Sequence, residues 1–331
     1  MSTVNIREQR QLDFFYDSLG VIKKYLDDDS VTDIMLNPDG RLWLDTFNRG
    51  QVLTDEVISF SDAECIIRAA ANMAGDFFDQ DKPSVSIEFP VTGERFQGIM
   101  PPQTKKPVFS IRKKPSRVMP LDEYLSSKII TNEQYDFLVS SVRARKNIVV
   151  AGPTGSGKTT FANAILNEVA KLNTRVAILE DTAELQCNAK NSYSFKTTSQ
   201  VGMGQLLKDT LRMNIDSIVV GEVRGGEALD LLKAWNTGHP GGVATIHSDS
   251  AIDALYRLEQ LILEASPSSQ RNLISRAVNI VIFLEKNSAR QRKVKEILKV
   301  RGLTERVSPY LVEPLKKDVV KSIVPVNSFC N

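Results

Sequence analysis

The stretch GPTGSGKT, residues 152–159, decides the fold of this chain. It fits the pattern G-x-x-x-x-G-K-[ST] at every fixed position, and a short apolar run, NIVVAG at 147–152, leads into it. The residues after it have the composition of a helix. A strand that ends in a glycine-rich turn and opens into a helix is the context in which this pattern binds phosphate. We therefore predict a P-loop at residues 152–159.

Each residue type in the loop has a physical reason to be there. The glycines let the backbone wrap so that its amides face phosphate oxygens, and the start of the helix adds about half a positive charge. Lys158 supplies a cation for the β and γ phosphates of ATP, and the Thr159 hydroxyl is a ligand for Mg²⁺. A glycine-rich turn without any ligand is the alternative. The residues expected to bind the nucleotide are Gly152, Pro153, Thr154, Gly155, Ser156, Gly157, Lys158, Thr159 and Thr160.

A parallel sheet is predicted around the P-loop. Further short apolar runs alternate with helical stretches, at 175–180, 216–222, 241–247 and 279–285. This alternation is typical of a parallel sheet covered on both faces. Such sheets bind ligands at the carboxyl ends of their strands.

Two of these runs end in carboxylates, at Glu180 and at Glu222. Phosphoryl transfer to water needs acidic groups to orient the water and to hold the metal. Gly221 stands where a Walker B aspartate is expected, so metal coordination falls mainly to Thr159 and water, with Glu222 as the acidic ligand. Either glutamate can be the general base, and a solvated strand end is the alternative for each.

The region before the P-loop domain has a different pattern. Residues 33–45 read as a hairpin about a Pro-Asp-Gly turn, and Ser61 with Glu64 has the spacing of a helix-capping box. Strand-like runs follow at 86–102 and 107–114. We therefore predict three parts: a smaller N-terminal α+β domain at 1–112, a basic, proline-containing linker at 113–120, and the P-loop domain at 121–331.

Composition excludes several classes of function. The 331 residues include 42 basic and 40 acidic ones, so there is no overall field that favours nucleic acid, and no sequence-specific nucleic-acid binding is expected. The three cysteines show no CxxC spacing, which argues against a zinc ribbon or a disulfide framework and fits a reducing cytoplasm. No apolar run reaches about 18 residues, so any membrane contact is expected to be peripheral.

Four sequence boxes carry a resemblance to a known family. They are RFQGIMPP with FSIRKK upstream, the P-loop, ILEDTAELQ, and the segment from Leu211 to Ala251 that contains GEVRGG and TGHPGGVATIHSDS. Together and in this order they resemble the secretion ATPase superfamily, and within it the conjugal transfer ATPases of type IV secretion. The resemblance implies an α/β fold in which a RecA-like P-loop domain carries a smaller N-terminal α+β domain.

The resemblance also implies an activity and partners. It implies Mg²⁺-dependent ATP hydrolysis by a homohexamer that drives pilus assembly or substrate transfer at the inner membrane. The protein would be cytoplasmic and peripheral to that membrane. Its partners would be copies of itself and inner-membrane secretion components, and it would act on the transported substrate indirectly.

The same resemblance assigns roles to a histidine and two arginines. Both histidines of the chain lie in TGHPGGVATIHSDS, and His247, at the predicted strand end, would read the γ-phosphate, whereas the alternative is that His239 and His247 only pack the turn. Arg95 and Arg112 would reach the γ-phosphate from the N-terminal domain, so that ATP draws the two domains together. Two solvated arginines are the alternative.

Other functions share parts of this pattern. A type IV pilus motor or a type II secretion motor has the same boxes, although the type II relatives usually carry a four-cysteine zinc insertion that this chain lacks. A nucleotide-gated docking scaffold with little turnover would keep the P-loop. A helicase-like translocase would need basic and aromatic strand-tracking loops, which are not evident.

Overall fold

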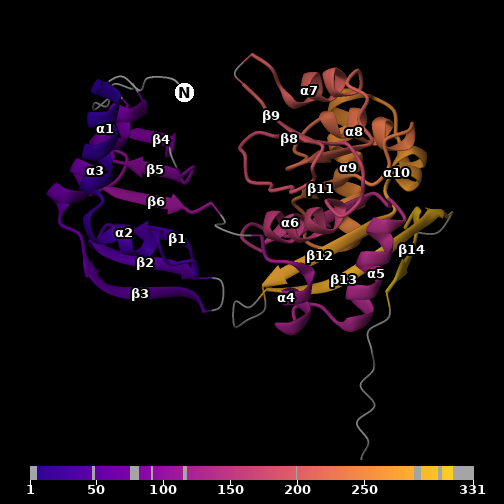
Figure 1. Ribbon diagram of the computed structural model, residues 1–331, viewed down its shortest axis with the longest axis horizontal. Coiled ribbons are helices and arrows are strands. Elements are labelled where there is room, and N and C mark those ends of the chain that lie inside the picture. Colours follow the sequence, from indigo (N-terminus) through magenta and orange to yellow (C-terminus); the bar gives the residue numbers. More distant parts are fainter. Residues whose placement is uncertain are drawn as a thin grey trace, which may run out of the picture. The chain divides into compact units, whose positions relative to one another are not determined.

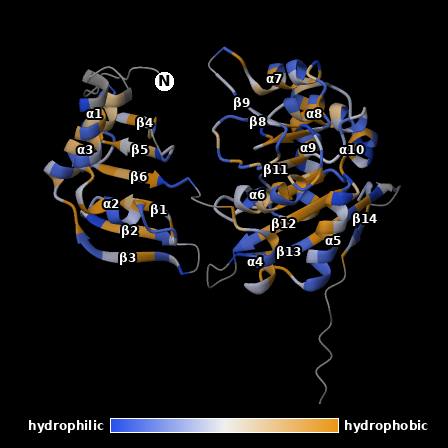
Figure 2. Cartoon of the chain, in the orientation of Figure 1, coloured by the Kyte–Doolittle hydropathy of each residue, from blue (hydrophilic) through white to orange (hydrophobic). Residues whose placement is uncertain are grey.

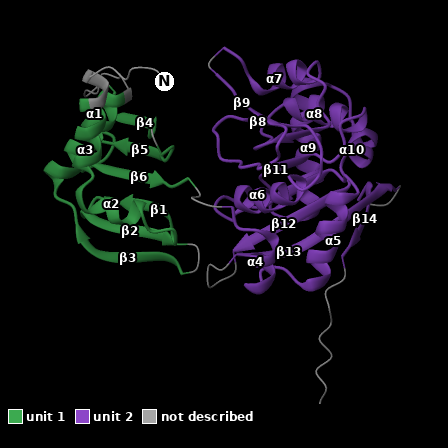
Figure 3. Ribbon diagram, in the orientation of Figure 1, with its two compact units in different colours: residues 1–117, 287–291 green, residues 118–286, 292–331 purple. Residues whose placement is uncertain are grey.

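The computed structural model describes residues 6–46, 49–74, 82–90, 92–114, 118–198, 200–286, 292–304 and 308–315 (Figure 1). The chain divides into two compact units, residues 1–117 with 287–291 and residues 118–286 with 292–331 (Figure 3). Within the described ranges, no helix has the length and apolar character needed to cross a membrane.

The first unit is an antiparallel sheet with helices packed against it. The strand order is β3-β2-β1-β6-β5-β4, and every neighbouring pair is antiparallel. The predicted hairpin at 33–45 is confirmed, because β1 and β2 pair about a turn closed by the Gly40 amide on the Asn37 carbonyl at 3.0 Å. The elements of this unit are α1 (Ile6–Ser18), η1 (Gly20–Ile22), α2 (Lys23–Leu26), β1 (Val31–Leu36), β2 (Arg41–Thr46), β3 (Gly50–Val57), α3 (Phe60–Ala74), β4 (Ser84–Glu88), β5 (Arg95–Ile99) and β6 (Val108–Arg112).

The start of α3 corrects one prediction. The helix begins at Phe60, and the hydroxyl of Ser59 accepts the amide N–H of Asp62 at 3.1 Å. Ser61 therefore lies inside the first turn, and the predicted capping box of Ser61 with Glu64 was wrong. Ser59 is the capping residue instead. Its hydroxyl also donates to the Asp62 carboxylate at 2.6 Å, and this second hydrogen bond fixes the side chain over the start of the helix.

The second unit is an eight-stranded sheet in the order β14-β13-β12-β7-β11-β10-β8-β9. Six strands, from β12 to β9, are parallel. Five of them are the predicted runs, whereas β9 was not predicted. The last two strands differ from the prediction of a parallel sheet: β13 pairs antiparallel with β12, and β14 pairs antiparallel with β13. The unit consists of α4 (Leu121–Ser126), α5 (Asn132–Arg143), β7 (Ile148–Ala151), α6 (Lys158–Val169), β8 (Val176–Glu180), β9 (Ser192–Lys196), α7 (Met203–Thr210), β10 (Ser217–Val220), α8 (Glu227–Asn236), β11 (Val243–Ile246), α9 (Ala251–Ala265), α10 (Arg271–Ala277), β12 (Ile280–Lys286), β13 (Arg292–Leu303) and β14 (Tyr310–Pro314).

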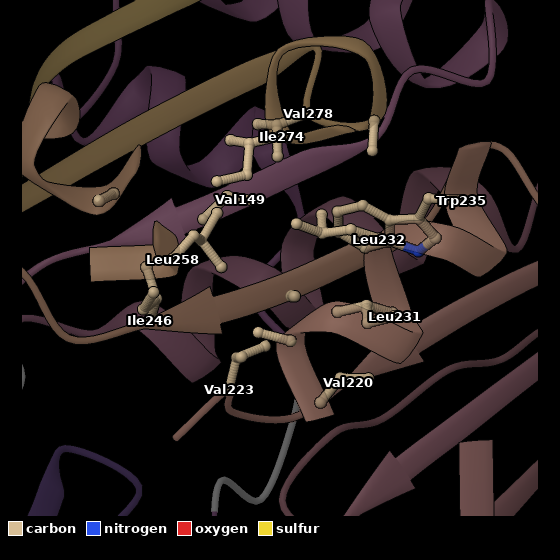
Figure 4. Close-up of a cluster of buried hydrophobic side chains, with 14 of the residues drawn as sticks. Val149, Val220, Val223, Leu231, Leu232, Trp235, Ile246, Leu258, Ile274 and Val278 are labelled. Carbon is tan, nitrogen blue, oxygen red and sulfur yellow. The ribbon is translucent and has the colours of Figure 1, made fainter. Parts of the chain in front are cut away.

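The central strands are buried along their whole length because both faces of the sheet are covered. Every residue of β7, β10 and β11 is buried. The strand β12, which pairs with β7, is largely hydrophobic in Figure 2. On one face, side chains such as Val149 and Ile246 pack with Leu232 and Trp235 of α8 (Figure 4). Trp235 is fixed there, since its Nε1 donates to the Ile218 carbonyl at 3.0 Å. The result is a rigid sheet whose carboxyl ends lie along one edge.

Candidate functional site

The loop between β7 and α6 has the backbone of a tight glycine turn. Gly152, Gly155 and Gly157 have φ values of 153°, 72° and 92°, which other residues rarely adopt. At Gly152 there is also no room for a side chain, because a Cβ would lie 2.4 Å from the carbonyl oxygen of Leu284 on β12. Pro153, Thr154 and Gly155 are exposed, so the outer part of the loop is accessible.

Lys158, the first residue of α6, is folded back onto this loop. Its side chain is buried, with 7% of the residue exposed, and its Nζ donates to the carbonyls of Gly152 at 3.0 Å and Pro153 at 3.1 Å. Thr159 and Thr160 follow it at the start of the helix and are half-buried. The ammonium is therefore held at the mouth of the glycine loop, beside the positive end of α6.

His247 connects the loop to the neighbouring strands. It comes directly after β11, and its ring lies with Nδ1 at 3.3 Å and Nε2 at 3.5 Å from Nζ of Lys158. Its Nε2 is also 2.9 Å from Oε1 of Glu222, which follows β10. Nδ1 of the neutral ring can accept a hydrogen bond from the ammonium, whereas the approach of Nε2 to the Glu222 carboxylate is a close polar contact without hydrogen-bond geometry. Three separate sequence motifs thus meet at one edge of the sheet.

The protonation of His247 follows from these contacts. Burial lowers the pKa of His247 below its ordinary value of 6.5, the charge of Lys158 lowers it further, and Glu222 opposes the shift. The ring is therefore neutral at neutral pH.

His239 has a different environment from His247. Its Nδ1 lies 2.7 Å from the carbonyl oxygen of Ile215, at the other end of the strand region. The seven residues between the two histidines cross the sheet along β11, so the pair does not meet in one site. His239 closes a turn, and only His247 reaches the P-loop.

Glu222 belongs to a chain of charges along the sheet edge. Its Oε2 accepts a hydrogen bond from the guanidinium of Arg224 at 2.5 Å, and that guanidinium lies 3.8 Å from Asp181, beyond β8. We did not predict a role for Arg224 from the sequence. The signal available was its place two residues after Glu222 in GEVRGG.

Glu180 is the most enclosed acidic group at this edge. Only 3% of it is exposed, and its Oε1 accepts the amide N–H groups of Glu184 at 2.9 Å and Leu185 at 2.8 Å. It fills the space in front of Gly221, where a Cβ would lie 2.9 Å from Cγ of Glu180. The missing Walker B side chain at position 221 is thus explained by the glutamate on the neighbouring strand.

The two predicted arginines lie together in the first unit. Arg95 on β5 and Arg112 on β6 are directly opposite one another in the strand register, and Nε of Arg112 donates to Asp33 of β1 at 2.9 Å. Glu88 stands opposite Arg95 on β4. The side chain of Arg112 is 53% exposed, so an anion in solution can approach it.

A metal would find few protein ligands in the second unit. The described residues contain no group of three or more His, Cys, Asp or Glu side chains that could hold a metal ion. Mg²⁺ in nucleotide sites is bound by one or two protein groups, and phosphate oxygens and water supply the rest. The available groups, the Thr159 hydroxyl and the Glu222 carboxylate, fit a metal that arrives with a nucleotide.

A glycine loop between a parallel strand and a helix, closed by a lysine, defines a P-loop protein. A family model described as Type II/IV secretion system protein matches residues 86–306. The chain belongs to this family, and the predicted membership of the secretion ATPase superfamily is confirmed.

Individual relatives agree with the family assignment. Conjugal transfer protein TrbB of Rhizobium radiobacter is 47% identical, over 84% of this chain and 86% of the relative. Type IV secretion system protein PtlH of Bordetella pertussis is 29% identical, over 89% and 97% of the two chains.

A solved structure supports the fold. The Legionella pneumophila ATPase DotB matches with a TM-score of 0.60 and 17% identity, covering 90% of this chain and 82% of that one. The predicted class, an α/β P-loop domain with a smaller N-terminal domain, is confirmed.

Proposed function

We propose that this chain hydrolyses ATP, with Mg²⁺, at the site formed by the P-loop, His247 and Glu222. The observation that carries the proposal is the continuous contact from Lys158 to His247 to Glu222. The three residues come from three different parallel strands, so their meeting is a property of the folded sheet. A glycine turn that served only as a connection would not require a buried lysine beside a histidine and a carboxylate.

Each residue has a distinct task in the proposed reaction. Lys158, now on the carbonyls of Gly152 and Pro153, turns to the β and γ phosphate oxygens, where an ammonium forms charge-assisted hydrogen bonds. Glu222 accepts the proton of the attacking water. His247, neutral and in contact with both, holds the carboxylate in place and senses whether a γ-phosphate is present. Mg²⁺, held by Thr159 and Glu222, would neutralise charge on the phosphates.

We assign the catalytic base to Glu222 rather than Glu180. The Oε1 atom of Glu180 accepts two backbone amides and is shielded from solvent, so it is occupied in holding residues 184–185. The Glu222 side chain is 19% exposed and faces the imidazole that touches Lys158. A water molecule can therefore reach Glu222 more easily than Glu180.

The N-terminal unit supplies the second half of the proposed mechanism. Arg95 and Arg112 form an in-register pair of cations, and a guanidinium can meet phosphate oxygens with a planar fork of donors. We propose that they contact the γ-phosphate of bound ATP. ADP, which has no γ-phosphate, would lack these contacts.

The biological setting is proposed from the relatives. A relative with 47% identity is a conjugal transfer protein, which favours a role in conjugative DNA transfer. We propose a homohexamer in the cytoplasm, bound peripherally to inner-membrane components of the secretion system, where it drives pilus assembly or substrate transfer.

Steady-state phosphate release tests the activity. We expect the purified chain to release phosphate from ATP in the presence of Mg²⁺, and Lys158→Ala to abolish the release. Lys208→Ala, which removes an exposed lysine on α7, is the matched control and should keep wild-type turnover. Negligible phosphate release by the wild-type chain in every assembly state would contradict the proposed hydrolysis. The alternative, a nucleotide-gated docking scaffold with little turnover, would then be favoured.

A further inference from the structure

The hairpin of β12 and β13 runs along the P-loop on the side away from His247. In the sheet, β7 has β11 on one side and β12 on the other. The Leu284 carbonyl of β12 lies against Gly152, as described above. Beyond it, the pairing of β12 with β13 continues to Lys286 and Arg292, so this end of the hairpin lies next to the glycine loop.

Two cations stand at this end of the hairpin, directly beside the loop. A Cβ built on Gly155 would lie 3.4 Å from Nζ of Lys286, the last residue of β12. A Cβ built on Gly157 would lie 3.0 Å from Cδ and 3.3 Å from Nε of Arg292, the first residue of β13. Both side chains are half-buried. The two glycines that shape the turn are thus each covered by a cation from the same hairpin.

The two cations face one another across the hairpin. Lys286 and Arg292 are directly opposite one another in the strand register. Near them, the Val294 amide of β13 donates to the Ile129 carbonyl at 3.2 Å. The two positive charges therefore lie side by side at the glycine loop, where phosphate oxygens can meet both of them.

We infer that Lys286 and Arg292 bind the nucleotide at its α-phosphate and ribose end, a role that rests on the proposed ATP site. The γ-phosphate end of the nucleotide belongs on the side of His247 and Glu222, since His247, which follows β11, contacts Lys158 and is itself in contact with Glu222, which follows β10. The phosphate chain crosses the loop from there, so its other end comes to the side of β12. The two hairpin cations therefore hold the part that ATP and ADP share.

This position makes a specific prediction about affinity. Loss of a charge-assisted hydrogen bond to a phosphate group costs about tenfold in affinity or more. Lys286→Gln and Arg292→Gln should each raise the Kd of a fluorescent ADP and of a fluorescent non-hydrolysable ATP analogue by about tenfold, by the same factor for both.

The experiment is nucleotide titration of the full-length chain, with thermal unfolding of each variant measured without nucleotide. Lys293→Gln, which removes an exposed neighbouring charge on β13, is the matched control and should bind like wild type. Arg292→Lys should recover part of the lost affinity. Unchanged ADP affinity in both glutamine variants would overturn the inference, as would a loss confined to the ATP analogue. Lys158→Ala separates the two proposals: if it binds and hydrolyses ATP like wild type, the proposed ATP site itself is wrong.

Discussion

The ends of β8 and β10 carry the same residue type at the same edge of one sheet, yet their surroundings differ. Glu180 is enclosed and accepts two backbone amides from residues 184–185. Glu222 is partly open and contacts His247 and Arg224. One carboxylate organises the backbone around it, whereas the other joins a network that leads to the P-loop lysine.

This difference shows how a sheet without a Walker B aspartate can still hold two acidic groups at one edge, after β8 and β10. Gly221 has no side chain, and Glu180 from the adjacent strand occupies the space that one would fill. The absence of a side chain at Gly221 and the buried position of Glu180 therefore depend on each other. Glu222 is left as the group that water can reach, and the division of labour between the two strand ends can be tested by substitution.

The largest expected effect is on turnover in Glu222→Gln. The amide keeps the shape of the carboxylate but loses its basicity, so phosphate release should fall by about 100-fold or more. The melting temperature should stay close to that of wild type. Glu264→Gln, at an exposed position near the end of α9, serves as control. If Glu222→Gln hydrolysed ATP at the wild-type rate, Glu222 would not be the catalytic base.

Glu180→Ala should act first on stability. Two backbone amides lose their acceptor in a buried site, which costs about 1–3 kcal/mol for each unsatisfied group. Denaturant unfolding of the nucleotide-free chain measures the free energy of unfolding directly. A variant as stable as wild type would show that Glu180 does not organise residues 184–185.

Gly221→Ala tests whether the two positions act together. In the wild-type chain the added methyl group meets Cγ of Glu180, and overpacking of this kind costs about 1–3 kcal/mol. In a Glu180→Ala background the space is free, so the same substitution should cost much less. Equal costs in both backgrounds would mean that the two residues are independent.

The smallest expected effect is on the pH dependence. Because the pKa of His247 lies below 6.5 in the folded chain, the ring stays neutral from pH 8 down to pH 6.5, and turnover should show no step from it in that range. The unfolded chain takes up this proton at a higher pH than the folded chain does. Acidification below pH 6.5 should therefore lower the free energy of unfolding, and His247→Asn should lose that component. A step in turnover above pH 7 that disappears in His247→Asn would contradict the assignment.

The parts of the site that were predicted from the sequence are those that depend only on neighbouring residues in the chain. The P-loop, Lys158 and the placement of Glu222 and His247 after strands follow from motifs, since each requires only a strand and the residues after it. The alternative that both histidines only pack the turn was left open, and the structure places His239 on the Ile215 carbonyl and His247 beside Lys158. The fold class was also accessible, because buried parallel strands are apolar along their whole length.

Features that depend on strand register were missed. The contact of Glu180 with Gly221 requires that β8 lie beside β10, and nothing in either segment shows this. Arg224 and the hairpin cations Lys286 and Arg292 gain their positions from neighbouring strands in the same way. β13 and β14 were missed as well, because their half-exposed pattern lacks the apolar run that marked the parallel strands.

The central claim is that one site, made of the P-loop, His247 and Glu222, hydrolyses ATP with Glu222 as the base. The most direct test is to load wild type, Glu222→Gln and Glu180→Gln with radiolabelled ATP and Mg²⁺, isolate the protein, and determine which nucleotide remains bound over time. We expect ATP to persist on Glu222→Gln and to become ADP on wild type and on Glu180→Gln. Conversion to ADP on Glu222→Gln at the wild-type rate would contradict the claim.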